Sequence, residues 1–227
     1  MSSLAEQLKI SPAEFKKPSV IILIISNLVP VFGVIFLDWE IFQVMMLFWA
    51  ENVVIGGFNI VKMLLSTAGN TGNRGKKISM VPFFFIHYGI FTMVHGGLVF
   101  AIFGGVLEND EILTGISDSY HSLITPALGW AVAALALSHA ISFIFNYLGK
   151  GEFRKTTLDQ LMVQPYARVI ILHITILIGG FLVMFFGAPL IGLMFLIALK
   201  IYVDIISHVK QHNIFMPAST QVKKVES

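Results

Sequence analysis

Cysteine is absent from the 227 residues, and charged residues make up only 12% of them. Without cysteine the chain can form no disulfide, thiolate metal site, iron–sulfur cluster or cysteine nucleophile. The few positive residues sit in polar connections, and the formal net charge is only +2. Because nucleic-acid binding needs a basic patch or stripe, we exclude nucleic acid as a partner.

Apolar residues dominate instead: 56% of the chain is hydrophobic and the mean hydropathy is +0.82. Soluble domains are about half apolar and about one quarter charged. The apolar residues also gather into runs long enough to cross a hydrocarbon core roughly 30 Å thick. The composition therefore predicts an all-α fold, a polytopic transmembrane helical bundle whose first partner is the lipid bilayer.

We predict six membrane-spanning helices, over about residues 19–37, 41–65, 79–106, 124–148, 166–186 and 188–212. They follow an N-terminal arm, 1–18, and precede a polar tail, 213–227, which we expect to be disordered. The connection 149–165 combines basic residues with spaced apolar ones, which indicates a short amphipathic helix in the headgroup layer. No small-residue cleavage pattern follows the first run, so we expect that run to remain as a span.

Lysine and arginine mark one side of this bundle. They occur in the arm, the second-to-third loop, the fourth-to-fifth loop and the tail, whereas the other three connections lack them. Cytoplasmic loops carry the excess of these residues, so we expect both termini to be cytoplasmic. Paired glycines at 56/57, 96/97, 104/105 and 179/180 predict places where helices pack closely.

Ionisable residues recur inside the apolar runs. In the last run Lys200, Asp204, His208 and His212 are four residues apart and form one stripe along a helix face. Such groups are costly against lipid, so other polar groups must meet them. The candidate partners are Glu51, His87, His95, His139 and His173. A rise of roughly 1.5 Å per residue places Glu51 and Lys200 near the midplane and the others at nearby depths.

Imidazoles and carboxylates together are ligands suited to transition metals. We therefore predict a metal site, with zinc or iron first among the ions, formed by Glu51, His87, His95, His139, His173, Asp204 and His208. A bound metal would polarise a carbonyl or activate water, with Glu51 or Asp204 as general base. The hypothesis is a membrane enzyme acting on a lipid-like or small apolar substrate. Lys200 is evidence against a metal site, because its ammonium group repels the metal cation unless a carboxylate pairs with the lysine.

Three alternatives stay open. The same residues could form the relay of a proton-coupled or ion transporter, which needs a hydrated chain that reaches both surfaces. Haem b could be held by two histidines, His87 or His95 with His139 or His173. The groups could also be a structural network of dry, fully paired side chains. A homo-oligomer is likewise left open.

Three segments carry a family resemblance: Phe48–Trp49–Ala50–Glu51–Asn52 followed by Gly57, Asn59 and Lys62; His87–Tyr88–Gly89 through His95–Gly96; and Leu199–Lys200–Ile201–Tyr202–Val203–Asp204 before His208. With them the chain resembles an uncharacterised family of bacterial multi-pass membrane proteins, a domain of unknown function. The resemblance covers nearly all of the membrane region. It implies a helical bundle in the bacterial inner membrane and brings no assigned activity.

Overall fold

The computed structural model describes residues 30, 32–36, 39–68, 73–106, 112–186, 194, 197–198 and 201–202. It divides into two compact units, Trp39–Pro189 and a second unit formed by Met1–Asp38 with Leu190–Ser227. The predicted arm, the tail and most of the first and sixth spans lie outside the described residues. The stripe of Lys200, Asp204, His208 and His212 lies outside them as well.

Helices make up the regular structure of the unit Trp39–Pro189: α3 (Ile41–Leu65), α4 (Asn73–Phe103), α5 (Ile112–Leu123), α6 (Pro126–Ser142) with a π-helix (Phe143–Gly149), a 3₁₀ turn (Glu152–Arg154), α7 (Leu158–Val163) and α8 (Tyr166–Phe186). No strand occurs in the described part of the chain, so the all-α prediction is confirmed there. Four stretches are long and apolar enough to cross a membrane: Ile41–Leu65, Arg74–Phe103, Pro126–Gly149 and Leu158–Phe181.

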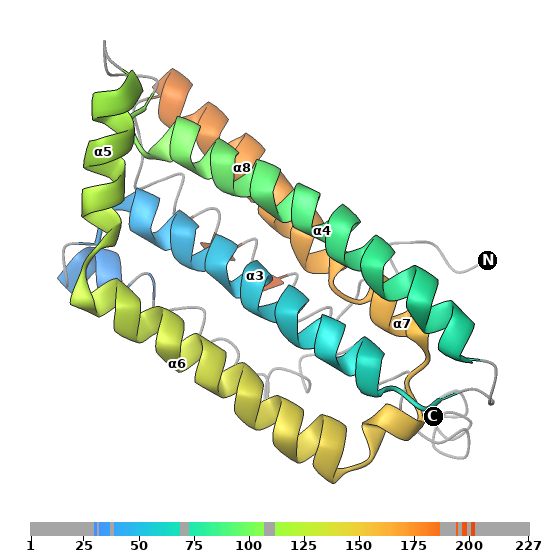
Figure 1. Ribbon diagram of the computed structural model, residues 1–227. Coiled ribbons are helices and arrows are strands. Elements are labelled where there is room, and N and C mark those ends of the chain that lie inside the picture. Colours follow the sequence, from blue (N-terminus) through green and yellow to red (C-terminus); the bar gives the residue numbers. More distant parts are fainter. Residues whose placement is uncertain are drawn as a thin grey trace, which may run out of the picture. The chain divides into compact units, whose positions relative to one another are not determined.

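Helix α3 is the central element of this unit. It packs against α4, α6, α7 and α8, and Figure 1 shows it between α6 on one side and α4 with α8 on the other. The outer faces of α4 and α6 expose large apolar side chains, among them Phe85, Met93, Trp130 and Phe145. A surface of this kind suits contact with lipid chains rather than water. The chain is therefore a membrane protein with a helical bundle.

Glycines set the close approach of α3 and α4. A Cβ atom at Gly56 would lie 2.4 Å from Cε1 of Tyr88, and one at Gly96 would lie 2.8 Å from Nε1 of Trp49. Each aromatic ring therefore rests on the backbone of the opposite helix, which only a glycine allows. The predicted close packing is confirmed at these two glycines. Gly57 has no described atom outside its own helix within 4 Å of such a Cβ, so only one member of that pair is a packing residue.

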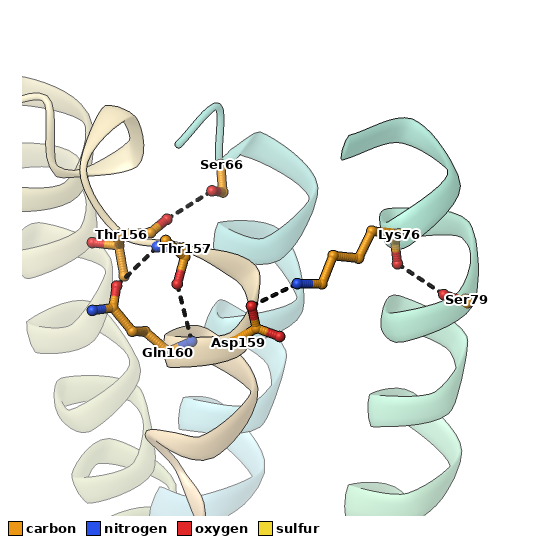
Figure 2. Close-up of polar contacts among 7 residues, drawn as sticks. All are labelled: Ser66, Lys76, Ser79, Thr156, Thr157, Asp159 and Gln160. Carbon is orange, nitrogen blue, oxygen red and sulfur yellow. Dashed lines mark hydrogen bonds and ion pairs between the residues drawn. The ribbon is translucent and has the colours of Figure 1, made fainter. Parts of the chain in front are cut away.

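Polar contacts stabilise the end of the bundle where α3 ends and α4 and α7 begin. The Ser66 hydroxyl donates to the Thr156 carbonyl at 2.8 Å, and Lys76 Nζ lies 2.6 Å from Asp159 Oδ2 (Figure 2). These contacts bring the loop after α3 beside the loop before α7. The basic residues in the first turns of α4 and those in the connection before α7 therefore lie at the same end of the bundle.

Helix α7 occupies the segment for which the sequence predicted an amphipathic helix in the headgroup layer. Its Leu158 and Leu161 are buried in a cluster with Met63 of α3 and Phe84 of α4. The Asn59 amide also donates to the Leu161 carbonyl at 2.8 Å. The apolar face of α7 thus has a protein partner, because α3 and α4 offer an apolar surface at that depth. As a result α7 continues into α8 as one long apolar stretch.

Helix α5 closes the opposite end. The Gln43 amide donates to the Ser122 carbonyl at 2.7 Å, and the Ser119 hydroxyl donates to the Gly104 carbonyl. The helix carries Asp118 and neither lysine nor arginine. The two ends of the bundle therefore differ in the sign of their charged residues.

Candidate functional site

An ion pair joins α3 to α8 within the apolar part of the bundle. Arg168 Nη1 donates to Glu51 Oε1 at 3.0 Å, and the two side chains are 39% and 17% exposed, respectively. Glu51 lies near the middle of Ile41–Leu65, and Arg168 lies near the middle of Leu158–Phe181. Each charge alone at this depth would be costly, so the pair neutralises both.

Arg168 is a site residue that the sequence reasoning missed. A span beginning at Tyr166 puts this arginine at the membrane surface, where a positive charge needs no explanation. In the structure the apolar stretch begins at Leu158, which moves Arg168 inward. Leu158 and Leu161 are buried against protein in the structure, but their spacing in the sequence does not separate protein from lipid as the partner, so the sequence carries no signal that places Arg168.

Two histidines meet between α4 and α8. His95 is only 3% exposed; its Nδ1 lies 2.6 Å from the Phe91 carbonyl oxygen, and its Nε2 lies 2.9 Å from Nδ1 of His173. A carbonyl oxygen can only accept, so Nδ1 of His95 carries a proton. In neutral His95 the Nε2 atom is then an acceptor. His173 must therefore donate its Nδ1 proton to His95.

This arrangement leaves one nitrogen available for a further proton. His173 is exposed, and within the described part of the chain its Nε2 has no hydrogen-bond partner. A proton that binds there makes His173 an imidazolium, and a shift of the Nδ1 proton across the hydrogen bond passes the charge to His95. The hydrogen bond thus lets the two rings share one added proton.

The other two described histidines of the predicted metal site, His87 and His139, face different neighbours. His87 is exposed, stacks on Phe83 of its own helix at a centroid distance of 5.3 Å, and lies 5.8 Å from the Tyr166 ring. His139 of α6 stacks on Phe58 of α3 at 6.4 Å. The histidines that depth alone placed in one layer therefore lie on different sides of α3 and α4.

The predicted metal site is only partly assembled by the described residues. Glu51 contacts Arg168, and His95 contacts His173. Among the described residues no group of three or more histidine, aspartate or glutamate side chains is placed to hold a metal ion. Asp204 and His208 lie outside the described residues, so their part in such a site stays a prediction.

Three buried polar atoms in the described residues have no hydrogen-bond partner: Asn52 Oδ1, Thr92 Oγ1 and Tyr166 Oη. They lie beside hydrogen bonds and ring contacts that join α3, α4 and α8. The Tyr88 hydroxyl donates to the Asn52 carbonyl at 2.9 Å, and its ring lies 6.0 Å from that of Tyr166. Trp49 Nε1 donates to the Thr92 carbonyl at 2.7 Å. The interface of α3, α4 and α8 therefore holds three polar atoms whose hydrogen bonds the described residues do not supply.

Comparison with known proteins gives a family and nothing more specific. No curated protein and no solved structure matches the chain. Residues 9–221 match the family of unknown function DUF6498, which confirms the resemblance seen in the sequence. Since that match spans nearly the whole chain, the protein belongs to the family of unknown function DUF6498.

Proposed function

We propose that this membrane protein takes up and releases a proton at His173 Nε2, shared across the His95–His173 pair, as part of the relay of a proton-coupled or ion transporter. The observation that carries the proposal is the hydrogen bond between the two imidazoles, whose direction is set by the Phe91 carbonyl. An imidazole can either donate or accept, so the proton between the rings can change sides without any backbone movement. A carbonyl or carboxylate in place of His173 could only accept, and would instead keep that proton on His95.

A purely structural role explains the pair less well. A network that only holds helices together is expected to have its polar atoms paired. His95 meets that expectation, but Nε2 of His173 has no partner in the described part of the chain, and the side chain is exposed. The pair therefore joins a buried ring to one whose second nitrogen is not covered by the described residues.

The ion pair between Glu51 and Arg168 supports this role. Arg168 precedes His173 by five residues on α8, roughly 7.5 Å along the helix axis. A lone arginine there would oppose a positive charge on the histidine pair. Because Glu51 neutralises Arg168, the arginine charge does not destabilise an imidazolium on His173 or His95.

We also propose six spans with both termini cytoplasmic, in the bacterial inner membrane that the family resemblance implies. What supports the orientation is the charge of the two ends. The basic residues in the first turns of α4 and in the connection before α7 lie at one end, and α5, which has Asp118 but no lysine or arginine, closes the other. Cytoplasmic loops are the basic ones.

Proton flux into liposomes tests the proposal. The purified protein would be reconstituted with a pH-sensitive dye inside, and an imposed potential would drive protons. We expect flux from the wild type, a loss of most of it in His95→Gln and in His173→Gln, and no change in His121→Gln, which alters an exposed histidine of α5. Equal flux in all four proteins, or none above protein-free liposomes, contradicts the proposal.

Metal-dependent chemistry on a lipid-like or small apolar substrate is the second candidate, and one distance favours it. Tetrahedral zinc with bonds of roughly 2.0–2.1 Å holds two nitrogens about 3.3 Å apart. His95 Nε2 and His173 Nδ1 are already 2.9 Å apart, so a small opening would make both ligands. Glu51, Asp204 or His208 would have to supply the rest, with Glu51 or Asp204 as base.

Elemental analysis with an absorption spectrum separates these candidates. Protein purified without chelator would be compared with a His95→Ala, His173→Ala double variant. Stoichiometric metal that is lost in the double variant supports the metal site, and a Soret band lost in the same way supports haem b. Absence of both leaves the proton relay and the structural network, which the flux measurement separates.

A further inference from the structure

We infer that water molecules occupy the interface of α3, α4 and α8, held by Asn52 Oδ1, Thr92 Oγ1 and Tyr166 Oη. We infer further that this internal water gives protons a route to the histidine pair; that second part rests on the proposed function. The first part stands on hydrogen-bond satisfaction alone.

Asn52 is the clearest of the three. Its Nδ2 donates to the Phe48 carbonyl at 2.9 Å, and the residue is only 6% exposed. A flip of the amide would turn Oδ1 toward that carbonyl, so the orientation is fixed by its partner. The Oδ1 atom is therefore an acceptor that points away from every described donor. A buried acceptor of this kind requires a donor, and water is a donor that fits where the described residues supply none.

Thr92 and Tyr166 supply hydroxyl groups with the same need. The Thr92 hydroxyl lies beside the Tyr88 hydroxyl, but it has no partner of full hydrogen-bond geometry among the described residues. The buried Tyr166 hydroxyl has no partner among those residues either. Two groups that donate or accept and one that only accepts carry no formal charge. That combination fits water, which usually makes about three hydrogen bonds when buried.

Tyr88 connects the three atoms in space. Its hydroxyl bonds the Asn52 carbonyl and its ring faces Tyr166, while Thr92 lies one turn later on α4. His95 follows Thr92 by three residues and so lies on the same helix face. Polar atoms therefore line one route along the interface, from Tyr166 toward the histidine pair. Water there would bring protons within one helical turn of His95.

Radiolytic hydroxyl-radical labelling of the protein in lipid discs tests for this water. Radicals formed from bound water modify side chains beside it, however deeply they are buried. We expect Tyr88 to be modified several-fold faster than Tyr147, which is equally buried but whose hydroxyl donates to the Lys62 carbonyl at 2.7 Å. Equal rates at the two tyrosines would overturn the inference.

Tyr166→Phe gives a second readout, because it removes only a hydroxyl that has no partner among the described residues. If the site is dry, removing that hydroxyl raises the thermal midpoint; if water fills it, the midpoint falls and labelling of Tyr88 slows. A rise in the midpoint overturns the water site. Labelling does not depend on transport, so the two parts of the inference are tested separately. Fast labelling of Tyr88 without proton flux rejects the proton route and keeps the water site. Proton flux without fast labelling of Tyr88 rejects the water site and keeps the proposed function.

Discussion

Breaking the pair between Glu51 and Arg168 should cost the protein much of its stability. We consider Glu51→Gln, Arg168→Gln and the double variant. Each single change leaves one charge inside the apolar part of the bundle. The double change leaves two neutral amides that can still bond each other. The structure therefore predicts that the double variant is no less stable than either single one.

The exposures of the two side chains set the size of the effect. Removing one partner of a fully buried pair costs about 3–5 kcal/mol, and an exposed pair contributes about 0–1 kcal/mol. With Glu51 17% and Arg168 39% exposed, this pair lies between those limits. We expect each single variant to lose about 2 kcal/mol, roughly a 30-fold change in the folded-to-unfolded ratio.

Equilibrium unfolding in mixed micelles, followed by fluorescence of Trp49 at the interface of α3 and α4, measures these losses. The ion pair of Lys76 and Asp159 is the matched control, because its side chains are 46% and 65% exposed. A double-mutant cycle on that pair should give a coupling energy of about 0.5 kcal/mol or less. The reasoning is refuted if the stability losses of the Glu51 and Arg168 single variants add up in the double variant, so that their coupling energy is no larger than that of the control pair.

Two further predictions concern packing and orientation. Gly56→Ala should destabilise the protein by about 1–3 kcal/mol, because its Cβ would overlap the Tyr88 ring, whereas Gly57→Ala should not; thermal unfolding of both variants checks this. Since the chain has no cysteine, Ser117→Cys and Ser219→Cys each introduce a single thiol, and an impermeant reagent on intact cells should label only the first. Labelling of Ser219→Cys alone would reverse the proposed orientation.

The helices follow closely from the sequence because apolar run length is a strong signal. The runs at 41–65 and 166–186 have the same bounds as α3 and α8, and α4 and α6 differ from expectation by a few residues at their ends. The segment before α8 was harder to place. An amphipathic helix buries its apolar face against lipid headgroups or against protein. The presence of Leu158 in the sequence does not distinguish these two partners.

The site shows the limit of depth counting. Counting residues placed Glu51 near the midplane, and the structure puts it near the middle of its helix. It could not give the direction of each side chain around the bundle, so His139 was grouped with His173 although it stacks on Phe58. The contact of His95 with His173 depends on how α4 and α8 rotate against each other, which no periodicity in one helix reveals.

The central claim is that His95 and His173 share a proton, and nitrogen NMR of histidine-labelled protein in bilayers observes that proton directly. We expect a nitrogen–nitrogen coupling across the hydrogen bond from His173 Nδ1 to His95 Nε2, with a proton on Nδ1 of His95. In His173→Gln this coupling should disappear and the Nε2 signal of His95 should shift, while the signals of His121 should not. Absence of any coupling between the two rings, with His95 signals unaffected by replacement of His173, would contradict the account.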